Sequence, residues 1–319
     1  MKSGALPAPF TYAWRMRNAL RLLLILIVVV APASGSAAAK LQHFTVMADG
    51  HPLALWAREA PQARGVIVLI HGRTWSALPD FDLQVPGEQR SVMQAFTDKG
   101  YTAYALDLRG YGKSPRDATG WLTPDRASRD VVAALEWLAS EKKVQKPTLV
   151  GWSQGSLISH LTAQRHPELI SNVVLYGYPR NLASPAPIPP VPESPARETN
   201  TRERAASDFI TPGSISQKAI DAYVAAALRA DPVRVDWREQ EKWSELDAAK
   251  LTTPTLVIHG ERDPLTPMEA QAALFTRLGT ADRQWVVLPA ADHAALLENS
   301  GPAFVAAIVG FVGRPRYVQ

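Results

Sequence analysis

Short apolar runs recur along this chain and alternate with segments of helical periodicity, and no other sequence feature limits the fold as strongly. The runs are rich in Val, Ile and Leu, which is typical of strands buried on both faces of a parallel sheet. The pattern therefore predicts an α/β fold, with a mostly parallel central sheet and helices on both of its faces. Strands are expected at Gly65–Ile70, Thr102–Leu106, Thr148–Gly151, Asn172–Tyr176, Thr255–Ile258 and Gln284–Leu288. Helices are expected at Ser91–Lys99, Arg126–Lys142, Gly155–Arg165, Pro267–Leu278 and Pro302–Val312.

The first two strands are expected to pair differently. Gln42–Met47 and Leu53–Arg58 flank the turn dipeptide Asp49-Gly50, and this arrangement predicts an antiparallel hairpin. We therefore expect the sheet to begin antiparallel.

The alternation stops between the sixth predicted strand and Thr255. Seven prolines lie between positions 179 and 195, and a helical region follows, best defined at Ser214–Arg229 with Ser214 and Gln217 as a capping box. The interruption is too long for a simple loop. We predict that residues 179–250 are a Pro-rich segment and a helical cap or lid, inserted between core segments 40–178 and 251–319. A linker between two domains is the alternative, but the C-terminal part is too small to fold alone.

The N-terminal segment, residues 1–39, has the pattern of a secretory signal peptide. Three arginines precede the apolar run Leu22–Val30, and small residues follow as far as Ala39. We therefore expect an exported protein, periplasmic or secreted, with Met16 as an alternative start. An uncleaved N-terminal anchor is the other interpretation, although the apolar run is short for a membrane span.

Charge and composition exclude several classes of function. The net charge is +4, from 34 basic and 30 acidic residues, and the four basic residues before Lys40 account for all of it. A neutral body lacks the basic surface of a nucleic-acid-binding protein. The absence of cysteine excludes disulfides, thiolate nucleophiles and Cys-ligated metals. We expect no metal and no organic cofactor.

The pentapeptide Gly151–Gly155 has the form G-x-S-x-G, with Ser153 at its centre. A predicted strand precedes it and a predicted helix follows, as in the sharp turn that exposes a nucleophilic serine. The helix N-terminus then points toward a developing oxyanion. A glycine-rich turn with a helix-capping serine is the alternative interpretation.

A serine hydroxyl needs a base, and the base needs an orienting acid. Of the seven histidines, His293 is the one that lies in a late loop, just after the last predicted strand. Asp263 follows the preceding strand, and Glu261 is the rival acid two residues earlier. The order Ser153, Asp263, His293 is the order found in α/β-hydrolases.

Motifs from His71 to His293 resemble the α/β-hydrolase superfamily over nearly the whole mature chain. His71-Gly72 is similar to its oxyanion loop, and residues 107–114 are similar to its D-x-R-G-x-G-x-S turn. That turn is typical of a branch with epoxide hydrolases, haloperoxidase-like esterases, C–C bond hydrolases and prolyl aminopeptidases. Asp107 and Arg109 are interpreted as a local ion pair that fixes the turn. The chain departs from the pattern at Ala290-Ala291-Asp292, where relatives often carry glycines.

The resemblance implies a role for each site residue. Ser153 would attack an acyl carbon, His293 would carry the proton, and Asp263 would hold the imidazole. The backbone N–H groups of Arg73 and Gln154 would form the oxyanion hole. Serine, where dehalogenases and epoxide hydrolases of this fold carry aspartate, directs the chemistry to acyl transfer.

Aromatic residues near these motifs predict an apolar or aromatic acyl pocket, with Trp75, Trp152 and Tyr178 as its lining. Core packing is the alternative interpretation of these side chains. The sequence thus predicts an exported serine hydrolase that cleaves carboxylic esters of small molecules. An aminopeptidase or C–C hydrolase on the same triad is the alternative, as is a ligand-binding protein on a hydrolase scaffold. Contact with a membrane is expected only if the N-terminal segment is retained.

Overall fold

The computed structural model describes residues 1, 4, 38–181 and 192–315. The described residues from 38 to 315 belong to one unit of the chain. Most of the predicted signal peptide, residues 2–3 and 5–37, lies outside the described residues. Residues 182–191 of the Pro-rich segment lie outside them as well. No helix in the described ranges combines the length and the apolar character needed to cross a membrane.

An eight-stranded sheet forms the centre of the unit, in the order β1-β2-β4-β3-β6-β7-β9-β10. Strand β2 runs antiparallel to both β1 and β4, and the other neighbours are parallel, which confirms the predicted fold class. The strands are β1 Leu41–Ala48, β2 His51–Arg58, β3 Gly65–Ile70, β4 Tyr101–Leu106, β6 Thr148–Trp152, β7 Asn172–Tyr176, β9 Thr255–Gly260 and β10 Arg283–Leu288.

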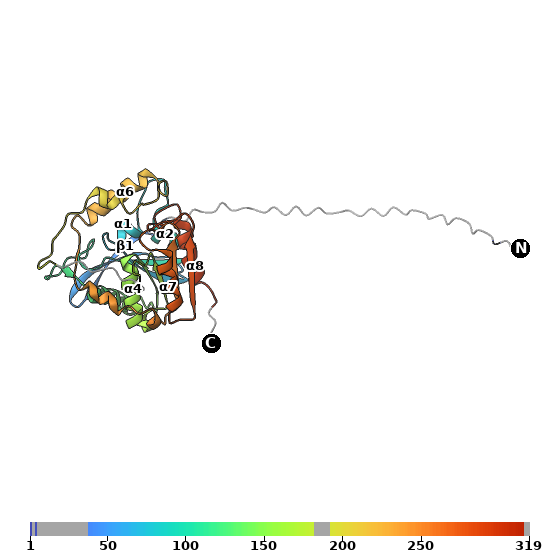
Figure 1. The fold of residues 1–319 in the computed structure, drawn as a ribbon, viewed down its shortest axis with the longest axis horizontal. Coiled ribbons are helices and arrows are strands. Elements are labelled where there is room, and N and C mark those ends of the chain that lie inside the picture. The colour runs from blue at the N-terminus through green and yellow to red at the C-terminus, as the bar shows by residue number, and fades with distance from the viewer. Residues whose placement is uncertain (2–3, 5–37, 182–191, 316–319) are drawn as a thin grey trace. The chain divides into compact units, whose positions relative to one another are not determined.

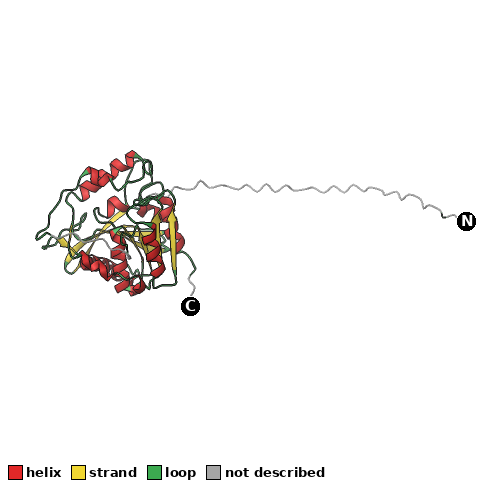
Figure 2. Cartoon of the chain, viewed as in Figure 1, coloured by secondary structure: helices red, strands yellow, loops and turns green. Residues whose placement is uncertain are grey.

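Helices cover both faces of this sheet (Figures 1 and 2). Because successive strand residues point to opposite faces, the core divides into two clusters, with Val150 in one and Leu149 in the other. Helices α2 (Val92–Asp98) and α8 (Gly301–Val312) pack on the first cluster. Helices α3 (Pro124–Glu141), α4 (Gln154–Arg165) and α7 (Met268–Arg277) pack on the second.

The segment between β7 and β9 supplies the longest helix outside the core, α6 (Gln217–Ala230), which lies above α1 (Ala77–Phe81) in Figure 1. The Ser214 capping box is wrong, because Ser216 caps α6 by accepting a hydrogen bond from Ala219 N at 3.1 Å. The remaining elements of the segment are α5 Arg202–Ala206, β8 Asp236–Trp237 and the 3-10 turns η2 Gln240–Glu245 and η3 Ala248–Lys250.

Several short elements were not expected from the sequence, and four of them illustrate why. They are α1, the 3-10 turn η1 (Pro167–Leu169) and a two-stranded parallel sheet of β5 (Trp121–Leu122) with β8. Each is too short to show a hydrophobic period. Tertiary contacts hold α1 in place instead, since the Ser76 N–H before it binds Asp231 at 2.8 Å.

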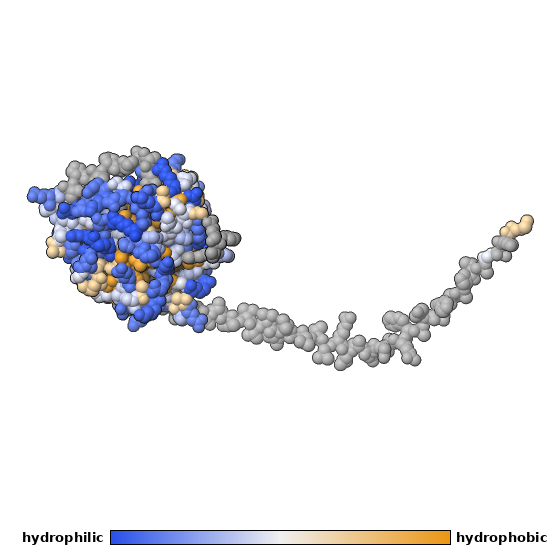
Figure 3. All heavy atoms as spheres, turned by 90° about the horizontal axis from the view of Figure 1, so that it is seen from below, coloured by the Kyte–Doolittle hydropathy of each residue, from blue (hydrophilic) through white to orange (hydrophobic). Residues whose placement is uncertain are grey.

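The face of the molecule in Figure 3 is mainly hydrophilic, with small and separate apolar areas. In the folded unit, the large apolar side chains that are exposed are Met47, Ile210, Leu265, Met268 and Val287. Scattered apolar residues of this kind are normal on a protein surface and indicate no interface by themselves.

Candidate active site

Ser153 stands at the sharp turn between β6 and α4. Its backbone has φ +54° and ψ −123°, a strained conformation for a residue with a side chain. A Cβ on Gly151 would lie 2.2 Å from the Gly155 carbonyl oxygen, and one on Gly155 would lie 2.2 Å from that of Ile70. The turn therefore requires glycine on both sides, and the Ser153 side chain stays partly exposed at the carboxyl edge of the sheet.

Asp263 and His293 form a direct pair, with 2.7 Å between Asp263 Oδ2 and His293 Nδ1. Thr266 Oγ1 also donates to Oδ2 at 2.6 Å, and Leu265 N donates to Oδ1 at 2.9 Å. Burial alone would raise the pKa of Asp263, but the hydrogen bonds from His293, Thr266 and Leu265 outweigh it and lower that pKa. An ionised Asp263 holds the proton on Nδ1 and leaves His293 Nε2 free to act as a base.

Glu261, the rival acid, does not contact His293. It is exposed, and its Oε2 accepts a hydrogen bond from Ala290 N at 2.7 Å. The structure therefore brings Asp263, and not Glu261, to the imidazole.

The ends of three neighbouring strands bring the site together. Ser153 N, after β6, donates to Tyr176 O at the end of β7 at 2.9 Å. Gly177 follows with φ +57°, and a Cβ there would lie 2.9 Å from His293 Cε1 and 3.7 Å from Asp263 Oδ2. Only glycine leaves room for the imidazole at this position, directly after the strand whose Tyr176 carbonyl binds the Ser153 N–H.

Two aromatic residues hold the histidine loop, residues 289–295. Trp152 Nε1 donates to His293 O at 2.7 Å. The Tyr176 hydroxyl donates to Asp292 O at 2.7 Å and accepts from Ala295 N at 2.9 Å. Sequence reasoning noticed these aromatics at the strand ends, but it did not identify them as anchors of this loop.

The oxyanion loop passes directly by Ser153. A Cβ on Gly72 would lie 3.6 Å from Ser153 Cβ. His71 accepts from Leu108 N through Nε2 at 3.2 Å and donates through Nδ1 to Gly72 O at 2.8 Å. Burial lowers the pKa of His71 to about 4, so the ring is neutral. Because a peptide unit is planar, fixing Gly72 O also fixes the direction of the Arg73 N–H.

Gln154 is the first residue of α4, so its N–H lies at the helix N-terminus next to Ser153. The structure thus places both predicted oxyanion donors, Arg73 and Gln154, in segments that adjoin the serine.

The predicted pocket residues are all buried. Trp75 donates from Nε1 to Asp208 at 2.9 Å, and Trp152 supports the histidine loop as described. The assignment of Tyr178 to the pocket is wrong. Its side chain is fully buried in the second core cluster, on the other face of the sheet from Trp152, and its hydroxyl binds His160 at 2.9 Å.

The expected ion pair between Asp107 and Arg109 is also wrong. Arg109 binds Asp130 on α3 and Asp117 instead. Asp107 accepts hydrogen bonds from Trp56 Nε1 and from the backbone N–H groups of residues 77 and 113, at 2.9 to 3.0 Å. The turn is fixed by these contacts and by the Arg109–Asp130 bridge.

Two carboxyl groups near the site, those of the buried Asp80 and the half-buried Asp208, were not identified from the sequence. The Tyr223 hydroxyl lies 3.0 Å from Asp80 Oδ1 and 3.2 Å from Asp208 Oδ2. Burial raises the pKa of Asp208 to about 6 despite the favourable interaction of its carboxylate with His293, and burial raises the pKa of Asp80 well above its usual value. No group of His, Asp and Glu in the described ranges has the arrangement to hold a metal ion.

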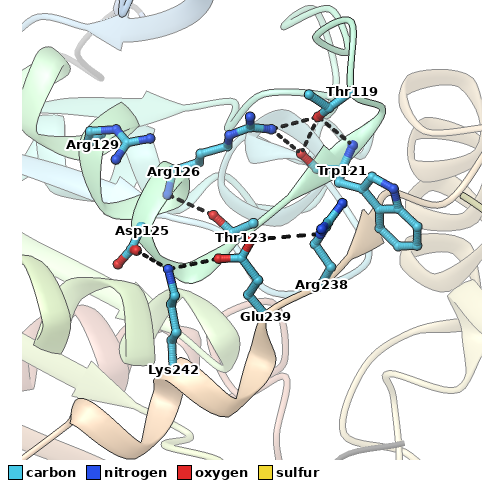
Figure 4. Close-up of a pocket in the computed structure, with 9 residues that line it drawn as sticks. All are labelled: Thr119, Trp121, Thr123, Asp125, Arg126, Arg129, Arg238, Glu239 and Lys242. Atoms are coloured by element: carbon cyan, nitrogen blue, oxygen red, sulfur yellow. Dashed lines mark hydrogen bonds and ion pairs between the residues drawn. The ribbon is translucent and has the colours of Figure 1, made fainter. Parts of the chain in front are cut away.

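A hollow of about 340 Å³ between α3 and η2 has a different character (Figure 4). Charged side chains of its lining form ion pairs with one another: Lys242 binds Asp125 at 2.7 Å and Glu239 at 2.8 Å. Arg126 binds Thr119 at 2.7 Å. With its charged groups already paired and none of the site residues in its lining, this hollow is not the catalytic centre.

The fold and this arrangement of strand ends define an α/β-hydrolase. A profile of the family described as serine aminopeptidase, S33, matches residues 61–300. Since this match spans most of the chain, the chain belongs to that family.

Curated relatives have low sequence identity to this chain, but the matches cover most of both proteins. A monoacylglycerol lipase of Mycolicibacterium smegmatis is 26% identical over 250 residues, covering 74% of this chain and 83% of the lipase. A pimeloyl-[acyl-carrier protein] methyl ester esterase of Aeromonas hydrophila is 24% identical and covers 67% of this chain and 85% of the esterase.

Solved structures support the fold. A serine hydrolase involved in carbazole degradation has a TM-score of 0.62 at 18% identity, covering 86% of this chain and 99% of that structure. Epoxide hydrolase A of Mycobacterium thermoresistibile has a TM-score of 0.63 at 18% identity, and the match covers 88% of this chain and 100% of that structure. At such low identity these likenesses establish the architecture and not the reaction.

Proposed function

We propose that this protein is an exported serine hydrolase that cleaves carboxylic esters through an acyl-enzyme on Ser153. The observation that carries this proposal is the strained Ser153 turn beside the buried Asp263–His293 pair, with 2.7 Å between the carboxylate and Nδ1. A turn that merely caps a helix does not require a serine with positive φ flanked by two obligatory glycines.

In the first half of the reaction, Ser153 Oγ attacks the ester carbonyl carbon while His293 Nε2 takes its proton. Asp263 remains ionised and stabilises the imidazolium that forms. The negative oxygen of the tetrahedral intermediate accepts hydrogen bonds from the N–H groups of Arg73 and Gln154, each worth about 3–4 kcal/mol in related sites. His293 then protonates the leaving alkoxide, and the C–O bond breaks to leave acyl-Ser153.

In the second half, His293 takes a proton from water, and the resulting hydroxide attacks the acyl carbon. The same N–H groups bind the second oxyanion. Collapse of this intermediate returns the proton to Ser153 Oγ and releases the carboxylic acid. The structural anchors Trp152, Tyr176 and His71 keep the base and one oxyanion donor in place throughout the cycle.

Relatives support an ester as the substrate. Two of those described above are named a monoacylglycerol lipase and a methyl ester esterase. The buried aromatic residue Trp75, near the oxyanion loop, suits an acyl group of apolar character.

An aminopeptidase is the second candidate, and one observation favours it. Asp208 is half-buried, and its carboxylate interacts favourably with the positive charge of protonated His293. An ionised Asp208 provides negative charge where a substrate ammonium group would be stabilised. The family name is also that of an aminopeptidase.

A substrate panel separates the two candidates. Wild type and Ser153→Ala are compared on p-nitrophenyl acetate, butyrate and octanoate and on aminoacyl p-nitroanilides. We expect Ser153-dependent turnover of the esters, with a slower reaction on the anilides. Faster turnover of anilides, lost in Asp208→Asn but not in Ser207→Ala, would instead establish the aminopeptidase. Ser207 is the matched control because it is the adjacent exposed residue.

Export is tested separately. The mass of the protein recovered outside the cytoplasm is compared with that of the precursor. Loss of a segment that ends near Ala33, Ala37 or Ala39 supports a cleaved signal peptide, and full length at the membrane supports an anchor.

A further inference from the structure

Asp292, directly before the base His293, joins the histidine loop to the segment between β7 and β9. Its side chain is completely buried. Asp292 Oδ2 accepts a hydrogen bond from Thr211 N at 2.6 Å, and Oδ1 accepts one from Ala294 N at 3.0 Å. A glycine at this position could form neither bond through a side chain. Asp292 therefore couples residues 211–214, here termed the cap hinge, to the loop that carries the imidazole.

Glu298 makes the second connection to the cap hinge. Its side chain is 2% exposed, and Oε1 accepts from Ser214 Oγ at 2.7 Å. Asn299 N donates to Ser214 O at 2.8 Å and strengthens the same junction. Glu298 Oε2 is buried and has no hydrogen-bond donor among the described residues, although the Asp292 carboxyl group lies within hydrogen-bonding reach.

Two buried carboxylates in contact repel each other strongly, and a buried oxygen without a donor is costly. One proton removes both costs. A protonated Glu298 Oε2 donates to Asp292, which then accepts a third hydrogen bond, and the pair carries a single negative charge. Burial, followed by the neighbouring Asp292, raises the pKa of Glu298 to about 7, which brings the titration of this carboxyl group into the neutral pH range.

The surrounding charged groups favour the shared proton. Among the described residues, neither carboxyl group forms an ion pair with a cation. Arg90 is bound to Glu88 at 2.8 Å and to Asn299 at 3.1 Å. Arg262 borders a surface hollow with Glu298 but forms no ion pair with it. The other titratable groups around the pair are Tyr176 of β7, Asp208, Glu261, Asp263 and His293.

We propose that Asp292 and Glu298 share one proton and act as a positioning pair, which fastens the cap hinge to the histidine loop. The connection loosens when this proton is lost at higher pH. The pair touches neither substrate nor the reacting atoms. It acts through the position of His293 and of the cap. The consequence for catalysis rests on the proposed hydrolase function, whereas the consequence for stability does not.

Glu298→Gln tests the proposal, since an amide nitrogen donates to Asp292 at every pH while the amide oxygen still accepts from Ser214. Ester kcat/KM, the rate at which a fluorophosphonate labels Ser153, and the midpoint of thermal unfolding are measured from about pH 6 to about pH 9. We expect wild type to lose roughly threefold to tenfold in both rates above neutral pH. Its thermal midpoint should fall as well, because a group with a raised pKa stabilises the fold at low pH and loses this contribution as pH rises. Glu298→Gln should keep its rates and its midpoint.

Glu261→Gln is the matched control, since it removes a carboxylate bound to the same loop, at Ala290 N, outside the pair. It should retain the wild-type pH dependence. If Glu298→Gln declines with pH as wild type does, the proposal is wrong. Should that variant fail to fold, Glu298→Met replaces it, because it removes the titrating carboxyl group at similar volume, leaves both hydrogen bonds of Asp292 in place and should likewise abolish the decline. If Ser153 is never labelled, the proposed function fails, and the thermal midpoints still decide whether the proton is shared.

Discussion

Replacing Asp263 by Asn should nearly abolish hydrolysis while the protein remains folded. Asp263 Oδ1 accepts from Leu265 N, and this backbone donor requires the amide oxygen of Asn at the same place. The amide nitrogen then occupies the position of Oδ2, 2.7 Å from His293 Nδ1, and donates to it. The ring proton is forced onto Nε2, where His293 can no longer accept the proton of Ser153.

The expected magnitude follows from that wrong tautomer. Comparable changes in other serine hydrolases reduce kcat by about 10⁴-fold, which corresponds to about 5 kcal/mol in the activation free energy. The assay is steady-state hydrolysis of p-nitrophenyl butyrate, with the thermal midpoint as a check on folding. Glu261→Gln is the control and should stay within about threefold of wild type. The reasoning is refuted if Asp263→Asn retains more than about a tenth of wild-type activity, or if Glu261→Gln loses as much as Asp263→Asn.

Three further substitutions probe the supports of the site. Gly177→Ala places a methyl group 2.9 Å from His293 Cε1 at a φ of +57° and should lower kcat by about tenfold or more; normal kinetics would contradict the crowding. Trp152→Phe removes the hydrogen bond to His293 O and should lower kcat by a few-fold, with KM little changed in steady-state assays. Tyr178→Phe leaves His160 without its hydroxyl partner and should cost about 1–2 kcal/mol of unfolding free energy in denaturant titrations, with unchanged kcat/KM; altered substrate preference would return Tyr178 to the pocket.

Much of the fold could be predicted because its main signals are local. Continuous apolar runs match the strands to within a few residues, since each buried parallel strand needs such a run. Helix α3 begins at Pro124 after a Thr123 cap, two residues before the predicted start at Arg126. The short helix α1 could not be predicted, because five residues contain no period and the contact at its start comes from Asp231, far along the chain.

The errors at the site have similar causes. Tyr178 was expected to line the pocket because it follows the sixth predicted strand, which ends at Tyr176 as expected. The positive φ of Gly177 then turns the chain, so the two tyrosines lie on opposite faces of the sheet. Arg109 could not be matched to Asp130 from sequence proximity, since that pair joins the turn to a separate helix. Asp263 was preferred to Glu261 from the sequence, and the 2.7 Å contact between Asp263 Oδ2 and His293 Nδ1 agrees with that choice.

The central claim is that Ser153 is a nucleophile activated by His293 and Asp263. The most direct measurement is to label wild type, Ser153→Ala and Asp263→Asn with a fluorophosphonate and to map the modified residue by mass spectrometry. The account predicts one label, on Ser153, formed rapidly in wild type, about 10³-fold or more slowly in Asp263→Asn, and absent from Ser153→Ala. A label on another residue, or equal labelling of wild type and Asp263→Asn, would contradict it.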